Sequence, residues 1–297
     1  SWNVLPSIYG VLYGGGSFLV VNHLTKQDKL AYLLEDCEAA FLLSDTIVSR
    51  HFIPAVANNT HLREIIYAWD YIEPFGPIAL SRFDDIHASA PAEAAARCES
   101  INLDLAALIY TSGSTGDPKG VKMTHQNMVF TSDSLVQYLR LDADARIMCF
   151  LPFAFDYGLY QILMAVRLGA SLVIGKSFAF PAQVFEQLRA SNATVFPGVP
   201  TVYSTLVNNY IKAPFTLPSV TRVTNTAAAL PADYIPTLKK IFPNALIIKM
   251  YGITECKRVC DLEPELIDSH STSVGKAIPG TQVMLLGNNM QPVAAHE

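Results

Sequence analysis

The sequence predicts an α/β fold in which mostly parallel strands are covered by helices. Short apolar runs, such as 39–43 and 245–250, alternate along the chain with segments of helical spacing, and this alternation is typical of β-α-β units. The chain has 297 residues, of which 51% are hydrophobic and 16% charged, so it can bury a large core.

The first third of the chain begins with a β-α-β unit. Three glycines at 14–16 separate a helix end from the apolar strand 17–21, and leucines at helical spacing predict a helix over 27–37. The next strand is expected at 39–43. We interpret the polar, alanine-rich segment 84–100 as a surface connection.

The remaining elements alternate in the same way. An apolar run at 105–109 leads through a Ser/Gly/Thr-rich loop to a helical segment at 125–139, which predicts strand, loop and helix. Further strands are expected at 147–151, 171–174, 194–196, 220–225 and 245–250, near Gly275 and at 283–286, and further helices at 160–168, 181–191, 200–210 and 233–241.

Composition excludes several classes of function. A net charge of -5 and the lack of an arginine-rich run provide no basic surface for nucleic acid. The longest apolar stretches are far shorter than the roughly 20 residues of a membrane-spanning helix, so we expect a protein with no transmembrane segment. Five cysteines, an odd number, do not predict a secreted disulfide framework, and a cytoplasmic location is expected.

A metal site at the cysteines is a weak hypothesis. Cys256 and Cys260 would share a face if their segment were helical, and His270 could join them, but a fourth ligand at recognisable spacing is missing. Packing residues are the simpler interpretation.

The stretch Tyr110-Thr-Ser-Gly-Ser-Thr-Gly-Asp-Pro-Lys-Gly120 is the most informative part of the chain. Its glycines allow backbone N–H groups to approach an anion, its hydroxyls add donors and Lys119 adds positive charge. Pro118 precedes the lysine, so the stretch is not the P-loop of kinases and GTPases. A flexible linker of the same composition is the alternative.

A second group of polar residues, Tyr251-Gly-Ile-Thr-Glu255, follows a buried strand, and open α/β sheets bind ligands at the carboxyl ends of their strands. An aromatic ring can stack on a base, a threonine can bond a phosphate oxygen and a carboxylate can hold Mg²⁺. The alternative is a tight turn in which Thr254 caps a helix.

Together these two stretches, with Val121 and Thr124-His125, closely resemble the adenylate-forming superfamily of acyl- and aryl-CoA ligases, amino-acid adenylation domains and luciferases. The segments Tyr13 to Asn22, Thr226-Ala-Ala-Ala-Leu-Pro231 and Ser273 to Thr281 extend the resemblance along nearly the whole chain. Lys249 is a departure, because many relatives have a polar amide there.

The resemblance implies roles for individual residues. Tyr251 would stack on adenine, Thr254 would bond the α-phosphate and Glu255 would place Mg²⁺, with Thr254, Glu255 and Lys119 as the catalytic set. The expected nucleotide-binding residues are Thr111, Ser112, Gly113, Ser114, Thr115, Gly116, Lys119, Ala227, Ala228, Tyr251, Gly252 and Thr254.

The segment Leu151-Pro-Phe-Ala-Phe-Asp-Tyr-Gly158 matches the place where the superfamily senses its substrate. In amino-acid adenylation domains an aspartate here binds the substrate's ammonium group, and Asp156 would take that role. Asp156 could equally be the N-cap of the helix that follows. The expected substrate-binding residues are Phe155, Asp156, Gly198 and Ala229.

The resemblance also implies a domain plan. The fold would contain two mostly parallel sheets, with a partial α/β subdomain at 1–100, the AMP-binding region at 101–270 and the start of a small β-barrel subdomain at 271–297. The catalytic lysine of the C-terminal domain would lie beyond Glu297, so we expect a fragment truncated at both ends with weak or no turnover alone.

The implied reaction is attack of a carboxylate on the α-phosphate of ATP, which gives an acyl-adenylate and pyrophosphate, followed by acyl transfer to a thiol. Our first hypothesis is an acyl-CoA synthetase of fatty acid metabolism, with coenzyme A as acceptor. The second is an amino-acid adenylation enzyme that loads the phosphopantetheine arm of a carrier protein, and the third is a non-catalytic nucleotide-binding module.

Overall fold

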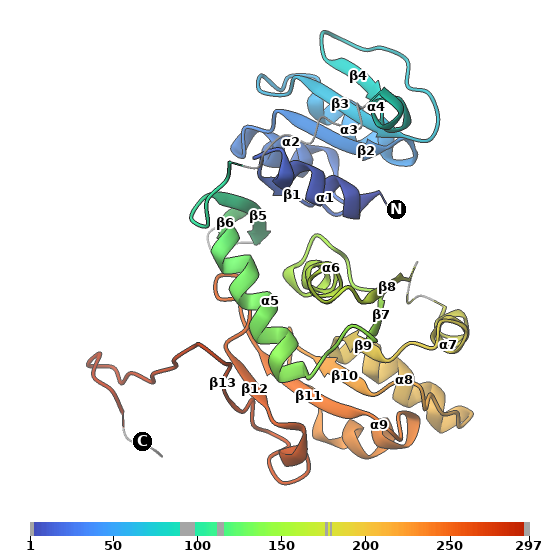
Figure 1. Ribbon diagram of the computed structural model, residues 1–297, viewed down its shortest axis with the longest axis vertical. Coiled ribbons are helices and arrows are strands. Elements are labelled where there is room, and N and C mark those ends of the chain that lie inside the picture. Colours follow the sequence, from blue (N-terminus) through green and yellow to red (C-terminus); the bar gives the residue numbers. More distant parts are fainter. Residues whose placement is uncertain (1–2, 90–98, 112–115, 176–177, 179, 294–297) are drawn as a thin grey trace. The chain divides into compact units, whose positions relative to one another are not determined.

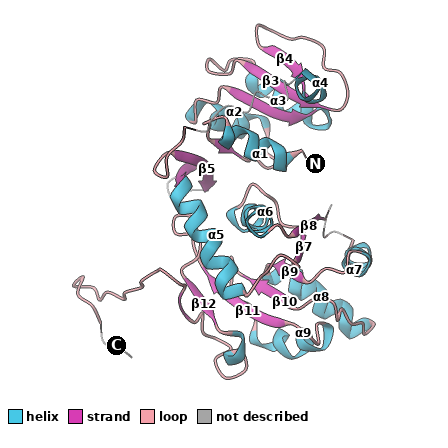
Figure 2. Ribbon diagram, viewed as in Figure 1, coloured by secondary structure: helices cyan, strands magenta, loops and turns pink. Residues whose placement is uncertain are grey.

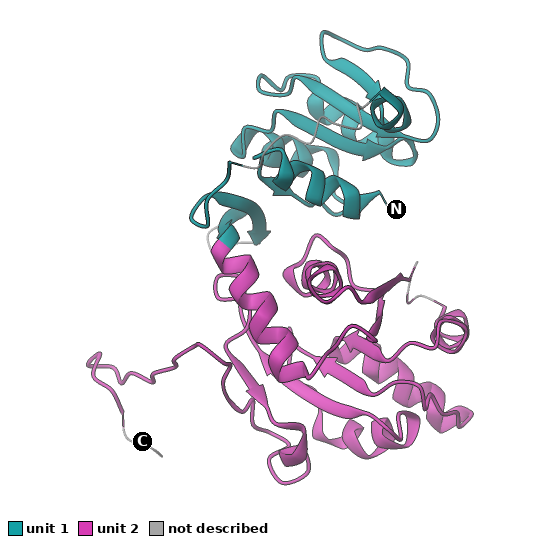
Figure 3. Cartoon of the chain, viewed as in Figure 1, with its two compact units in different colours: residues 1–125 teal, residues 126–297 magenta. Residues whose placement is uncertain are grey.

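The structure is a computed structural model that describes residues 3–89, 99–111, 116–175, 178 and 180–293. The chain forms two compact units, residues 1–125 and 126–297 (Figure 3). Both contain helices and strands (Figure 2), so the α/β prediction is confirmed.

The first unit contains two three-stranded sheets. Its elements are α1 (Val4–Tyr13), β1 (Phe18–Leu19), α2 (Gln27–Asp36), β2 (Phe41–Asp45), α3 (Ser49–Val56), β3 (Glu64–Ala68), β4 (Ala79–Arg82), α4 (Phe83–Ser89), β5 (Leu105–Thr111) and β6 (Lys119–Thr124). The parallel sheet β2-β3-β4 forms a core with α2 and α3 that includes Leu34 of α2, Phe52 of α3 and Ile65 of β3. The other sheet has the order β1-β5-β6.

One prediction for this unit was wrong, and one segment contains a helix that was not predicted. The phosphate stretch does not run from strand through loop to helix, because β6 pairs antiparallel with β5 before the helix begins. The segment predicted as a polar connection contains α4 up to Ser89, while residues 90–98 lie outside the described part.

The second unit is built on a seven-stranded sheet (Figure 1). Its helices are α5 (His125–Leu139, from Gln126 onward in this unit), α6 (Asp156–Leu168), α7 (Pro181–Ala190), α8 (Pro200–Lys212) and α9 (Ile235–Ile241). Its strands are β7 (Arg146–Cys149), β8 (Ser171–Ile174), β9 (Val195–Gly198), β10 (Arg222–Asn225), β11 (Leu246–Tyr251), β12 (Cys260–Leu262) and β13 (Lys276–Ala277).

The order of the strands is β13-β12-β11-β10-β9-β7-β8. The pairs from β8 to β11 are parallel, as expected for strands joined by helices, and the last two pairs are antiparallel. The predicted strand at 283–286 does not form, since only an isolated bridge joins Leu286 to Pro292.

Alternate residues of β10 face different helix layers. Val223 belongs to the core formed with α7, α8 and α9. On the other face, the Arg222 guanidinium donates to the Leu139 carbonyl at the end of α5, and the Thr224 hydroxyl bonds with the Tyr157 hydroxyl of α6. The two-residue period of the strand therefore places apolar and polar partners on opposite sides of the sheet.

The turn at Gly275 depends on glycine. Its φ of +82° is unfavourable for other residues, and a Cβ atom there would overlap the Asp261 carbonyl of β12. We expect Gly275→Ala to lower the free energy of unfolding by about 3 kcal/mol or more, because strain and overlap add.

The matched control is Gly10→Ala in the exposed part of α1, where no atom lies within 4 Å of an added Cβ. It should raise stability by about 0.5–1 kcal/mol. Urea denaturation of both variants tests the contrast, and equal stabilities would contradict this account of the turn.

Candidate functional site

The strand order reverses between β7 and β9. From β7 the chain crosses to β8 on one side, whereas β9, β10 and β11 follow on the other side. Open parallel sheets bind ligands at the carboxyl ends of the strands beside such a reversal. The carboxyl ends of β7, β9, β10 and β11 lie at this edge. The residues at or after these ends include the predicted substrate residues, the alanines at 227–229 and the turn from Tyr251 to Glu255.

Asp156 begins α6 immediately after the loop from β7. Its N-cap interpretation was wrong, because the extended residue Phe155 occupies the N-cap and makes no side-chain cap bond. Asp156 Oδ1 accepts from the Tyr157 N–H at 2.8 Å, and Oδ2 accepts from Arg258 Nη1 at 3.1 Å. The carboxylate is 16% exposed, so ligands can reach its free lone pairs.

Buried hydroxyls fix the start of α6 against the sheet. Tyr157 and Tyr203 both donate to the Thr224 carbonyl of β10, at 2.7 and 2.6 Å. Burial raises the pKa of Tyr157, so its hydroxyl stays protonated as a donor. Gly198 at the end of β9 is buried, and a Cβ there would lie 2.7 Å from the Tyr203 ring.

The turn after β11 brings two cations to the same place. Lys257 and Arg258 are buried, at 2% and 3% exposure, and the Arg258 guanidinium lies 5.0 Å from the centre of the Tyr157 ring. The Lys257 ammonium donates to the Thr254 carbonyl, and burial lowers its pKa to about 8. These two residues were not predicted; their position directly after Tyr-Gly-x-Thr-Glu was the available signal.

The Tyr251 segment is a turn between β11 and β12. Tyr251 is the last residue of β11 and is 47% exposed, which leaves its ring open to stacking. Glu255 is exposed and Thr254 half-buried. A Cβ on Gly252 would overlap the Lys257 carbonyl, so this turn requires glycine. The interpretation of Thr254 as a helix cap was wrong, because no helix follows in residues 252–259.

The loop after β10 exposes Ala227, Ala228 and Ala229. Ala227 has a left-handed backbone, with φ of 73°, and Asn225 Nδ2 donates to the Ala228 carbonyl at 2.9 Å. A left-handed backbone is unfavourable for alanine, and the bond from Asn225 helps to hold the loop in this conformation. Lys249 is directed elsewhere, since its ammonium donates to the Ser271 carbonyl.

In the first unit, the phosphate stretch connects β5 to β6, and Thr111 pairs with Lys119. Gly116 has φ of +112°, which favours glycine, and Lys119 is exposed. The predicted residues Ser112, Gly113, Ser114 and Thr115 lie outside the described residues.

Side chains of α2 hold the ends of this stretch. Tyr32 donates to the Pro118 carbonyl at 3.0 Å, and Tyr110, the residue before Thr111, donates to the Asp36 carboxylate. Tyr32 also reaches Asp36, at 3.5 Å. These three residues therefore connect α2 to both sides of the phosphate stretch.

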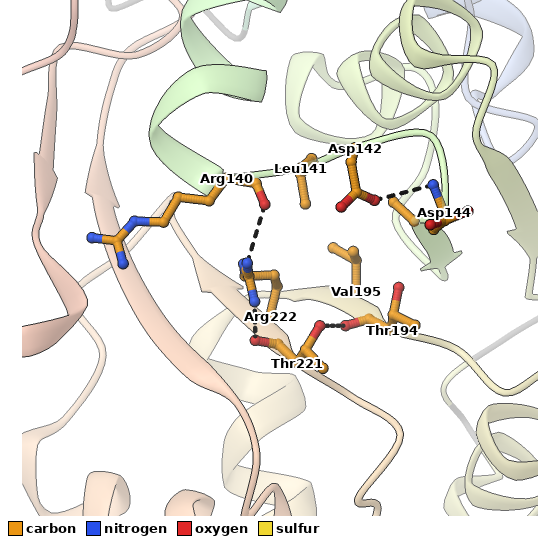
Figure 4. A pocket seen from close by; sticks show the side chains of 9 residues that line it. Arg140, Leu141, Asp142, Asp144, Thr194, Val195, Thr221 and Arg222 are labelled. Carbon is orange, nitrogen blue, oxygen red and sulfur yellow. Dashed lines mark hydrogen bonds between the residues drawn. The ribbon is translucent and has the colours of Figure 1, made fainter.

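A hollow also lies at the opposite edge of the large sheet, and its hydrogen bonds have a structural role. It lies beside the amino ends of β7, β9 and β10 (Figure 4). Within it, Arg222 donates to the carbonyls of Arg140 and Thr221, and Thr221 donates to the Thr194 carbonyl. The guanidinium thus satisfies backbone groups at the end of α5.

The cysteine hypothesis was wrong in its geometry, because Cys256 is exposed in a turn and Cys260 lies in β12. Among the described residues, no group of three or more His, Cys, Asp or Glu side chains is placed to hold a metal. In the same part of the chain, no helix is long and apolar enough to cross a membrane.

Comparison with known proteins agrees with this architecture. Indigoidine synthase of Dickeya dadantii is 26% identical over 99% of this chain but only 19% of its own length, and a long-chain-fatty-acid–CoA ligase of Bacillus subtilis is 24% identical over 97% of this chain and 55% of its length. The crystal structure of VinN superposes with a TM-score of 0.81 and 30% identity over 99% of this chain and 70% of VinN. VinN also has structures with L-aspartate and with 3-methylaspartate.

The family model for the AMP-binding enzyme matches residues 1–297. This match extends from the first unit through the phosphate stretch to the Tyr-Gly-x-Thr-Glu turn of the second. The chain belongs to the AMP-binding enzyme family, whose members form adenylates from ATP.

Proposed function

We propose that this chain is the nucleotide-binding part of an enzyme that activates the carboxylate of an amino acid as an adenylate. The observation that carries the proposal is Asp156, a partly exposed carboxylate at the reversal of strand order. Two of its lone-pair positions are used by Tyr157 and Arg258, and the others are available to an ammonium group. The VinN complexes with L-aspartate and 3-methylaspartate support an amino acid as substrate.

In the proposed reaction, a substrate carboxylate oxygen bonds to the α-phosphorus of ATP, and the bond from that phosphorus to the bridging oxygen breaks. The products are the aminoacyl-adenylate and pyrophosphate. Tyr251 stacks on adenine, the backbone of Ala227 and Ala228 passes beside it, and Thr254 donates to the α-phosphate. Lys119 and the phosphate stretch neutralise the departing pyrophosphate.

Glu255 fits a magnesium ion that is held mainly by phosphate oxygens and water. It is exposed in the turn, and no acidic cluster accompanies it in the described residues, so it would supply a single carboxylate ligand. Bound Mg²⁺ would neutralise charge on the phosphates.

A thiol then receives the acyl group. For an amino-acid substrate we propose that this thiol belongs to the phosphopantetheine arm of a carrier protein, and that the enzyme is cytoplasmic. Indigoidine synthase, of which this chain matches 19%, is a longer relative.

An acyl-CoA ligase with coenzyme A as acceptor is the second candidate. The exposed Phe155, beside Asp156, offers an aromatic surface to an apolar acid. In addition, the Bacillus subtilis relative is named a long-chain-fatty-acid–CoA ligase. A non-catalytic nucleotide-binding module is the third, and it would give no exchange with any acid.

The choice among these is testable by ATP–pyrophosphate exchange in the full-length protein with panels of amino, fatty and aryl acids. We expect exchange with amino acids, and we expect Asp156→Asn to lower kcat/KM for them by about 100-fold, since a buried charge-assisted interaction is lost.

The matched control for Asp156 is Asp133→Asn. Asp133 is an aspartate of α5 that pairs with Arg167 at the surface, and its loss should leave exchange unchanged. Circular dichroism should show that both variants fold. If folded Asp156→Asn exchanges amino acids as fast as the wild type, Asp156 does not bind the substrate's ammonium group.

The contacts of α2 should position the phosphate stretch. Tyr32→Phe removes the bond to the Pro118 carbonyl, and we expect KM for ATP to rise by about 3- to 10-fold, which corresponds to one hydrogen bond. Tyr71→Phe, at a side chain that is 70% exposed, is the control. An unchanged KM in Tyr32→Phe would show that the stretch does not depend on α2.

Metal dependence tests Glu255. We expect Glu255→Gln to raise the Mg²⁺ concentration needed for half-maximal exchange by about 10-fold, because one anionic ligand is lost. Glu73→Gln, at an exposed loop position, should leave the titration unchanged. Identical titrations for wild type and Glu255→Gln would argue against metal placement by this carboxylate.

A further inference from the structure

We propose that Arg258 forms, beside Asp156, a subsite for a second carboxylate of the substrate, so that the acid activated is a dicarboxylic amino acid. This inference rests on the proposed function, because it takes Asp156 as the partner of the substrate's ammonium group. It is carried by the hydrogen bonds and charges around the Arg258 guanidinium.

The guanidinium is only partly satisfied. Nη1 donates to Asp156 Oδ2 at 3.1 Å and to the Lys257 carbonyl at 2.6 Å. Nε and Nη2 are buried and find no acceptor among the residues that the structure describes. An arginine side chain keeps its charge even when it is buried, and leaving charged donors unsatisfied away from water is unfavourable.

The unused donors have a specific geometry. Nε and Nη2 lie along one edge of the planar guanidinium, and together they form the fork that binds both oxygens of a carboxylate. The opposite side is engaged by Asp156 through Nη1, and the Tyr157 ring lies 5.0 Å from the guanidinium carbon. The side chain is therefore held with its carboxylate-binding edge buried and unpaired.

The charges of the side chains around Arg258 also favour binding of a carboxylate. Lys257 and Arg258 are both buried, whereas Asp156 is the one largely buried carboxylate that contacts them in the described residues. Asp261, which is also buried, lies opposite Lys276 in the β12–β13 pair, and Glu255 is exposed. The cluster has one positive charge in excess, and a bound carboxylate would balance it.

The combination selects a class of substrate. Asp156 can accept an ammonium group while Arg258 binds a carboxylate beside it, so the ligand carries both groups. The carboxylate held by Arg258 is bound rather than activated, since activation requires a free oxygen. A second carboxylate is therefore needed for reaction with ATP, and acids such as aspartate or glutamate meet this requirement.

The experiment compares matched acids in pyrophosphate exchange with the full-length protein. L-alanine and β-alanine each lack one of the two carboxylates of L-aspartate. We expect kcat/KM for L-aspartate or L-glutamate to exceed that for either alanine by about 30-fold or more, the usual effect of a charge-assisted pair.

Variants of Arg258 connect the preference to this residue. Arg258→Gln should bring the ratio of dicarboxylic to monocarboxylic amino acids within about 3-fold, and Arg258→Lys, which keeps the charge without the fork, should give an intermediate ratio. Arg167→Gln, at an exposed ion pair, should keep the wild-type ratio. If Arg258→Gln does not fold, the wild-type and Arg258→Lys ratios decide the question.

The possible failures are distinguishable. A wild-type preference for amino acids with one carboxylate would overturn the Arg258 subsite and leave the proposed amino-acid activation standing. Exchange only with fatty or aryl acids would overturn both. An unchanged preference in folded Arg258→Gln would place the second carboxylate elsewhere and overturn the assignment.

Discussion

The reversal of strand order beside β7 is the constraint on which the substrate side of the proposed site depends. Because the crossover from β7 leads away from β9, the segments after these two strands run to opposite sides, and ligands of open α/β sheets bind at such a reversal. The segment after β7 turns directly into α6 and brings Asp156 to this edge. A Cβ on Gly158 would overlap the Pro152 carbonyl, so the turn packs closely against the first turn of the helix.

Burying the cations of the β11–β12 turn requires compensation from several elements. The Asp156 carboxylate comes from α6, the Tyr157 ring faces the Arg258 guanidinium, and Thr224 of β10 anchors the Tyr157 hydroxyl. Lys257 adopts a left-handed backbone, with φ of 62°, and closes over Gly252. Such an arrangement is strained and incompletely paired, which is more typical of binding sites than of cores.

The sequence predicted the repeated strands and helices of the second unit because their apolar spacing is regular. It did not predict β6, since Lys119-Gly-Val-Lys-Met-Thr124 has mixed polarity and becomes a strand only through pairing with β5. Conversely, the apolar run 283–286 forms no strand, because only Pro292 meets Leu286 across an isolated bridge. Strand formation at these places depends on partners that local spacing does not specify.

The predicted nucleotide residues came from three short patterns, and the structure provides conformational reasons for Gly116 and Gly252 in two of them. The partner of Asp156 could not be predicted in this way. Arg258 is 102 positions away in the sequence, and it reaches Asp156 only through the turn after β11. A charged residue in a turn is ordinarily exposed, so its burial became apparent only from the packing of α6 against β10.

The Asp156–Arg258 pair can also exclude wrong substrates. An apolar acid that covered this pair would remove water from it and supply no hydrogen bonds in return, whereas a zwitterionic acid replaces the lost water with its own charges. The residues proposed to contact ATP would offer no comparable discrimination, because every acid activated by this chemistry uses the same nucleotide. On the proposed function, selection among acids would therefore depend on whether a substrate can satisfy the Asp156 carboxylate and the unpaired edge of Arg258.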